Sequence, residues 1–157
     1  MRAILDANVA GQVFGASRPP AGAKFFEWID SGRGRLVIGG RLRRELDRLS
    51  AFGEWRRQAV LAGRVTLLND EDVDGRATEL AQENACRSDD EHVVAVAQLG
   101  GARLLFTNDG DLQADFKDRD LVDDPRGKVY TTRVREDWTP AHRRLLADRT
   151  LCVSRRR

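Results

Sequence analysis

Cysteine, proline and long apolar runs are all scarce in this chain of 157 residues, which contains 2 Cys and 4 Pro. Cys86 and Cys152 lie far apart and belong to no C-x-x-C or Cys/His pattern, which argues against a zinc site or a disulfide framework and predicts two reduced thiols. No apolar run approaches the roughly 20 residues that span a bilayer, and the first run reaches Asp6 too soon for a signal peptide. The sequence therefore predicts a cytoplasmic protein without a membrane span.

The composition is rich in charge but nearly balanced. Hydrophobic residues make up 41% and charged residues 33%, and the formal net charge is +2. A chain of this length and composition fits one soluble domain, because domains cluster at roughly 100 to 150 residues. We expect this domain over residues 1–157, with a core at about 2–131 and a C-terminal helix and basic tail at about 132–157. No internal repeat or low-complexity segment is present.

Apolar runs alternate with helical patterns along the chain. This alternation predicts an α/β fold, a three-layer α/β/α sandwich around a central, mostly parallel sheet. A polar loop is expected around 118–124. The predicted strands are 2–5, 36–38, 65–68, 103–106 and 128–131, and the predicted helices are 8–14, 23–29, 41–49, 54–62, 70–85, 89–99, 111–116 and 140–147. The aromatic helix at 23–29 is most simply core, and a partner surface is the alternative.

Two of the predicted buried strands run directly into an aspartate, Asp6 and Asp109. Ligands bind outside the carboxyl ends of strands in open α/β sheets, so these carboxylates are expected to converge. Asp90 opens a helical run, and Glu45 lies in another at 42–49. An all-oxygen set of this kind suits Mg²⁺ or Mn²⁺, which can activate water for phosphodiester hydrolysis.

The context of these acids resembles a known pattern. The N-terminal Ile4-Leu5-Asp6-Ala7-Asn8-Val9, the trio Arg44-Glu45-Leu46, and the stretch from Ser88 to Leu112 together resemble the PIN-domain family of metal-dependent ribonucleases. Many members of that family are toxins of toxin-antitoxin pairs. The resemblance spans about residues 2–116.

The resemblance implies an endoribonuclease that uses Mg²⁺ or Mn²⁺. It assigns Asp6, Glu45, Asp90 and Asp109 to the acidic centre, Asp111 to an accessory acid, and Thr107 or Asn8 to orienting polar groups. The neighbouring Asp89 is the alternative to Asp90. The implied partners are RNA, as a single strand or a structured loop, a cognate antitoxin protein, and a second copy of the chain in a homodimer.

Each acid also has an ordinary structural explanation. Ser88 and Glu91 match an S-x-x-E capping box. Glu45 could form surface ion pairs with Arg41 or Arg48. Asp109 could cap the following helix, as Asp70 or Asp72 could cap the helix at 70–85. Asp6 is the hardest to explain in this way, because no long helix follows it.

Two other functions are compatible with parts of the sequence. A strand that ends on an aspartate also begins haloacid-dehalogenase-like phosphatases, but Asn8 stands where their second acid belongs. A non-catalytic PIN-like module that binds RNA or serves as a scaffold is the stronger alternative. Most basic residues are arginine, which suits phosphate contacts. The predicted phosphate contacts are Lys24, Arg41, Arg44 and Arg87, and the arginines at 155–157 could serve either RNA or solubility.

Overall fold

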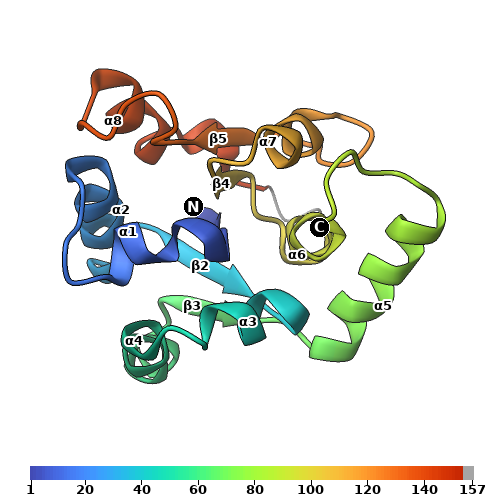
Figure 1. Ribbon diagram of the computed structural model, residues 1–157, viewed down its shortest axis with the longest axis horizontal. Coiled ribbons are helices and arrows are strands. Elements are labelled where there is room, and N and C mark those ends of the chain that lie inside the picture. The colour runs from blue at the N-terminus through green and yellow to red at the C-terminus, as the bar shows by residue number, and fades with distance from the viewer. Residues whose placement is uncertain (154–157) are drawn as a thin grey trace.

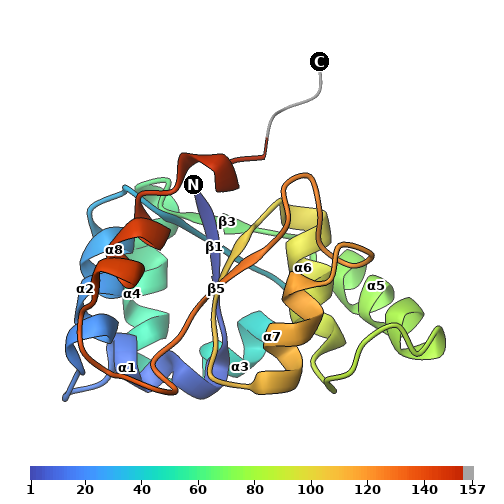
Figure 2. The ribbon, with the colours of Figure 1, turned by 90° about the horizontal axis from the view of Figure 1, so that it is seen from above.

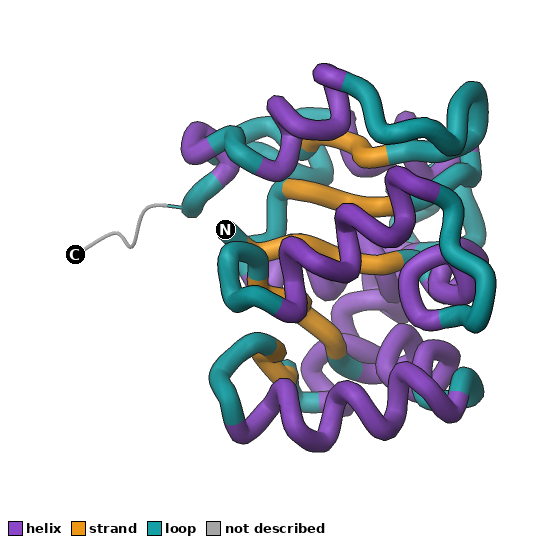
Figure 3. The backbone as a smooth tube through the Cα atoms, turned by 90° about the vertical axis from the view of Figure 1, so that its left-hand side faces the viewer, coloured by secondary structure: helices purple, strands orange, loops and turns teal. Residues whose placement is uncertain are grey.

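The sheet has five parallel strands in the order β3-β2-β1-β4-β5 (Figures 1 and 3). The structure is a computed structural model that describes residues 1–153, so the arginines at 155–157 lie outside the described residues. The strand order places β1 in the centre, where the chain switches from one half of the sheet to the other. The strands are β1 (Arg2–Leu5), β2 (Arg35–Ile38), β3 (Val65–Leu67), β4 (Leu104–Phe106) and β5 (Lys128–Tyr130).

Helices cover both faces of this sheet (Figures 1 and 2), which confirms the predicted three-layer α/β/α sandwich. One layer contains α1 (Ala10–Phe14), α2 (Pro20–Asp30), α4 (Ser50–Leu61) and α8 (Pro140–Leu146). The other contains α5 (Asp70–Gln82), α6 (Glu91–Gly100) and α7 (Gly110–Lys117). The short helix α3 (Gly40–Leu46) follows β2 and packs on α5 and α6, and the 3₁₀ turns are η1 (Ala7–Val9) and η2 (Arg149–Leu151).

The core explains why the strands are continuous apolar runs. The last three residues of β1 and all of β4 are fully buried, as expected for parallel strands covered on both faces. In α2, Phe25, Trp28 and Ile29 are buried and Phe26 packs on the core, so the aromatic helix is core as predicted. None of the helices in residues 1–153 has the length and apolar character needed to cross a bilayer.

The predicted cap of α5 is wrong. Asn69 is the N-cap, and its side chain accepts a hydrogen bond from the Asp72 N–H. Asp70 instead accepts from the Gly40 N–H at 2.8 Å and pairs with Arg43 at 2.8 Å. These contacts connect residues far apart in sequence, which a local capping pattern does not reveal. Asp70 therefore fixes the start of α3 against α5.

Candidate active site

The candidate site forms where β1 and β4 end. These strands are neighbours with Leu5 opposite Phe106, so the residues that follow, Asp6 and Thr107, are adjacent. The Asp6 N–H donates to the Phe106 carbonyl at 3.0 Å and extends the pairing by one residue. This is the point where strand order reverses, the position at which open α/β sheets bind ligands.

Asp6 is buried and tied to β4 through Thr107. Its side chain is only 3% exposed, its Oδ2 accepts from the Thr107 hydroxyl at 2.7 Å, and its Oδ1 accepts from the Asn8 N–H at 3.4 Å. The Thr107 hydroxyl in turn accepts from the Asp109 N–H at 3.1 Å. Burial, and secondarily the charge of Asp109, raise the pKa of Asp6 above its ordinary value. Thr107 thus orients two of the predicted acids, whereas Asn8 contributes its backbone.

The charges of all three other predicted acids contribute to the pKa of Asp90. Asp90 is the N-cap of α6 but makes no side-chain capping hydrogen bond. Burial, followed by the negative charges of Asp6, Asp109 and Glu45, raises its pKa from 3.8 to about 6. Because charges separated by much more than a few ångströms act weakly on one another, the contributions of Asp6, Asp109 and Glu45 indicate that these acids lie in the neighbourhood of Asp90.

Asp109 serves a structural role as well. It is the N-cap of α7, and its Oδ1 accepts from the Leu112 N–H at 3.0 Å, so the capping interpretation is correct for this residue. Its charge still reaches Asp6 and Asp90. Asp111 lies exposed in the first turn of α7, and Asp89 is exposed. Within residues 1–153, neither forms a hydrogen bond or ion pair with the four converging acids.

Glu45 joins the cluster from α3 and has two partners. Its Oε1 accepts from Arg41 Nε at 2.7 Å, which confirms that ion pair, whereas Arg48 forms none within the described chain. Its Oε2 lies 3.4 Å from His92 Nε2. Burial lowers the pKa of His92, so the ring is neutral at pH 7. With the proton on Nε2, His92 donates to Glu45 and its buried Nδ1 has no hydrogen-bond partner among residues 1–153.

A second contributor that the sequence did not reveal is Asp115 on α7. It is 3% exposed and accepts from the Arg87 N–H at 2.7 Å, the Ser88 N–H at 2.9 Å and the Ser88 hydroxyl at 2.6 Å. The Ser88 Oγ also accepts from the Asp90 N–H at 3.3 Å. The predicted capping box is therefore wrong, because Ser88 lies before the N-cap and its hydroxyl donates to Asp115. These hydrogen bonds fix residues 87–90, the segment that positions Asp90 at the candidate site.

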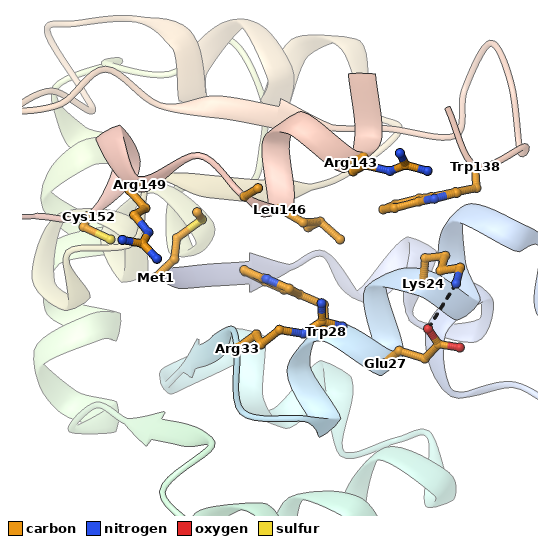
Figure 4. A pocket seen from close by; sticks show the side chains of 11 residues that line it. Met1, Lys24, Glu27, Trp28, Arg33, Trp138, Arg143, Leu146, Arg149 and Cys152 are labelled. Carbon is orange, nitrogen blue, oxygen red and sulfur yellow. Dashed lines mark ion pairs between the residues drawn. The ribbon is translucent and has the colours of Figure 1, made fainter. Parts of the chain in front are cut away.

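The predicted phosphate contacts are scattered. Arg41 is exposed and near the cluster, since it pairs with Glu45 and lowers the pKa of Asp90. Arg44 pairs with Asp74 on α5 at 3.0 Å, and the Arg87 side chain is exposed. Lys24 lies on the side of α2 that faces α8 (Figure 4). Arg41 is thus the member of this set that the electrostatics connect to the acids.

The donor set fits a hard divalent cation in chemistry, although the side chains are not gathered into a finished coordination site. Within residues 1–153, no group of three or more His, Cys, Asp or Glu side chains is arranged to hold a metal ion. Burial is the main cause of the raised pKa values of Asp6 and Asp90, and the negative charges of neighbouring acids add to it, so a bound cation would stabilise the ionised carboxylates. Carboxylate oxygens are the ligands that Mg²⁺ and Mn²⁺ prefer.

Comparisons of the chain with protein-family models, with curated proteins and with solved structures find no match.

Proposed function

We propose that this protein is an endoribonuclease that hydrolyses RNA phosphodiester bonds with Mg²⁺ or Mn²⁺. The observation that carries the proposal is the hydrogen-bonded group of Asp6, Thr107 and Asp109 beyond the paired ends of β1 and β4. Asp90 lies near enough to this group and to Glu45 for their charges to add to the effect of burial on its pKa. The resemblance of the surrounding motifs to PIN-domain ribonucleases supports the same reaction and its substrate. One buried and three partly buried carboxylates near one another cost stability when they are ionised, which favours a site that a cation completes.

The proposed roles follow from the surroundings of each acid. Asp6, Asp90 and Asp109 hold the cation, with Asp111 as an accessory acid. The chemistry that the cation supplies is Lewis acidity toward water and the scissile phosphate. We assign Glu45 to accepting the proton of the attacking water or to binding a second ion, because Arg41 and His92 fix its orientation. Arg41 is the proposed contact to a substrate phosphate.

We also propose the partners that the resemblance implies, a cognate antitoxin protein and a second copy of this chain, in a cytoplasmic setting. A toxin of this kind would be held inactive by the antitoxin until it is released. Size-exclusion chromatography with light scattering measures whether the purified chain is a dimer. A chain that stays monomeric at every concentration would contradict the homodimer.

Cleavage of end-labelled single-stranded RNA tests the activity. The parent chain, Asp90→Asn and Asp89→Asn are each incubated with Mn²⁺, with Mg²⁺ or with a chelator. We expect cleavage by the parent only with metal, and a loss of about a hundredfold or more in Asp90→Asn, because even outer-shell changes at metal sites cost 10- to 100-fold. Asp89→Asn is the matched control, since it removes the same charge one residue away from an exposed position.

Each outcome has a distinct meaning. Equal cleavage by the parent and Asp90→Asn, or cleavage in chelator, would contradict the proposed centre. Loss of cleavage in Asp89→Asn instead of Asp90→Asn would move the assignment to Asp89. RNA binding without cleavage by the parent would identify the alternative function, a non-catalytic PIN-like module.

A further inference from the structure

A groove of about 820 Å³ lies between α2 and α8, away from the acidic cluster (Figure 4). Met1, which precedes β1, forms part of its wall, whereas Asp6 follows β1 at the opposite end. At about 3.3 Å per residue, the strand between them separates the two regions by roughly 16 Å. The groove is therefore a second surface, distinct from the candidate active site.

Positive charge dominates the lining of this groove. Lys24, Arg33, Arg143 and Arg149 face a single acidic side chain, Glu27, which pairs with Lys24 at 3.4 Å. Arg33 donates to the Ser31 hydroxyl at 3.0 Å. Within residues 1–153, none of the three arginines forms an ion pair, and all three are exposed. A concave surface with unpaired cations focuses its field on anions.

An aromatic side chain lies beside these cations. Trp138 is half-buried just before α8, and its ring stacks on His142 with an interplanar angle of 13° and centroids 6.2 Å apart. Trp28 is 3% exposed, so its ring forms part of the groove wall and offers no open face on which a base could stack. Figure 4 shows Trp138 near Arg143 and Lys24 at one end of the groove and Arg149 near Met1 at the other. Indole faces next to arginines hold single strands, because bases stack on the ring while phosphates engage the cations.

We propose that the α2–α8 groove binds a segment of single-stranded RNA outside the cleavage site. The identity of the nucleic acid rests on the proposed function, but the binding itself does not require hydrolysis. A strand supplies both regularly placed phosphates for the arginines and a flat base for Trp138. An acidic peptide would satisfy the arginines alone, so the combination of side chains favours RNA.

Fluorescence anisotropy of a short labelled single-stranded RNA tests the groove in chelator, where cleavage is absent. The test variant is Arg143→Gln with Arg149→Gln in the full chain. Its matched control is Arg57→Gln with Arg119→Gln, which removes the same charge from exposed positions outside the groove. We expect the test variant to reduce the salt dependence of log K by about 1.4 and to weaken binding about 25-fold at 0.1 M salt, while the control changes little.

A second variant probes stacking without altering charge. Trp138→Leu keeps an apolar side chain at the start of α8, and we expect it to weaken RNA binding about fivefold or more. Equal losses in the test and control arginine variants would overturn the proposal, because they would indicate nonspecific charge. Binding of a mononucleotide as tightly as the strand, or equal competition by an acidic peptide, would overturn it as well.

The two proposals fail separately. Groove-dependent binding in chelator without metal-dependent cleavage would contradict the nuclease and leave the groove supported. Metal-dependent cleavage, together with RNA binding that is unchanged by the substitutions at Arg143, Arg149 and Trp138, would contradict only the proposal that the groove binds RNA.

Discussion

Replacing Asp90 by Asn should make the metal-free protein more stable at neutral pH. Asp90 makes no side-chain capping bond, and Asn is an equally good N-cap, so the substitution removes charge without removing a contact. A pKa raised from 3.8 to about 6 corresponds to about 3 kcal/mol of unfavourable interaction in the ionised form. Solvent screening of this partly exposed group, and its favourable position at the helix N-terminus, reduce the expected gain to about 1–2 kcal/mol.

The sign of the pH dependence follows from the direction of the shift. The folded protein keeps a proton on Asp90 up to about pH 6, whereas the unfolded chain releases it near 3.8. Between these values the folded state binds more protons, so the free energy of unfolding falls as pH rises. The penalty from Asp90 is absent below about pH 4 and complete above about pH 6. In Asp90→Asn this fall should shrink, and the contribution of Asp6 should remain.

Thermal and denaturant unfolding in chelator, from about pH 4 to about pH 8, measure this effect. The gain should raise the melting temperature of Asp90→Asn by roughly 2–8 °C near pH 7. Asp89→Asn is the control, and its pH profile should match the parent. Metal at about 100 times its Kd should then stabilise the parent by about 2.7 kcal/mol and the variant by much less. An Asp90→Asn protein that is less stable than the parent at pH 7, or one that keeps the full pH slope, would refute the reasoning.

Four further substitutions test the packing around the site, beside the groove and in α4. Asp115→Ala should lower the free energy of unfolding by about 2–4 kcal/mol in urea titrations, because it leaves buried donors of residues 87–88 unpaired, and Ser88→Ala should cost less, about 1 kcal/mol. Equal losses of stability in the two variants would contradict the role that we assign to Asp115, which is to accept three hydrogen bonds from residues 87–88. Gly34→Ala should cost about 1–3 kcal/mol by calorimetry, because its Cβ would overlap the buried ring of Trp28. Gly53→Ala should instead stabilise α4 by about 0.5–1 kcal/mol, since its Cβ meets nothing within 4 Å, and a loss there would indicate a contact absent from the structure.

The sequence predicted the parts of the fold that depend on local patterns. Parallel strands covered on both faces are continuous apolar runs, so their ends at Asp6 and Asp109 stand out. The general rule that ligands bind beyond the carboxyl ends of parallel strands predicted that the two acids lie near each other, whereas the strand order that makes β1 and β4 neighbours was not predicted. Glu45 lies in α3 and Asp90 is the N-cap of α6, so where these two acids lie depends on how the helices pack, which the local pattern does not predict.

Contacts between distant residues were not predictable from such patterns. The local sequence predicts that Ser88 caps a helix, but in the structure its hydroxyl donates to Asp115, which lies 27 residues later in the chain. Asp115 lies three residues after the buried Leu112 and next to the buried Phe116 in α7, but an aspartate is rarely fully buried, so the sequence alone did not identify it as a buried residue. His92 lies two residues after Asp90 on a helix that is otherwise apolar on its buried side, and a buried polar residue in such a run is the signal that could have identified it.

The central position of β1 also means that the four predicted acids come from both halves of the sheet and are therefore made at different times during synthesis. Synthesis begins at the N-terminus, so Asp6 and Glu45 are made together with the part of the chain that forms β1 to β3. Asp90 and Asp109 emerge later, and Asp109 reaches its place only when β4 pairs with the exposed edge of β1. Of the four predicted acids, the first half of the chain therefore supplies only Asp6 and Glu45, and all four can be brought near one another only after β4 has been made.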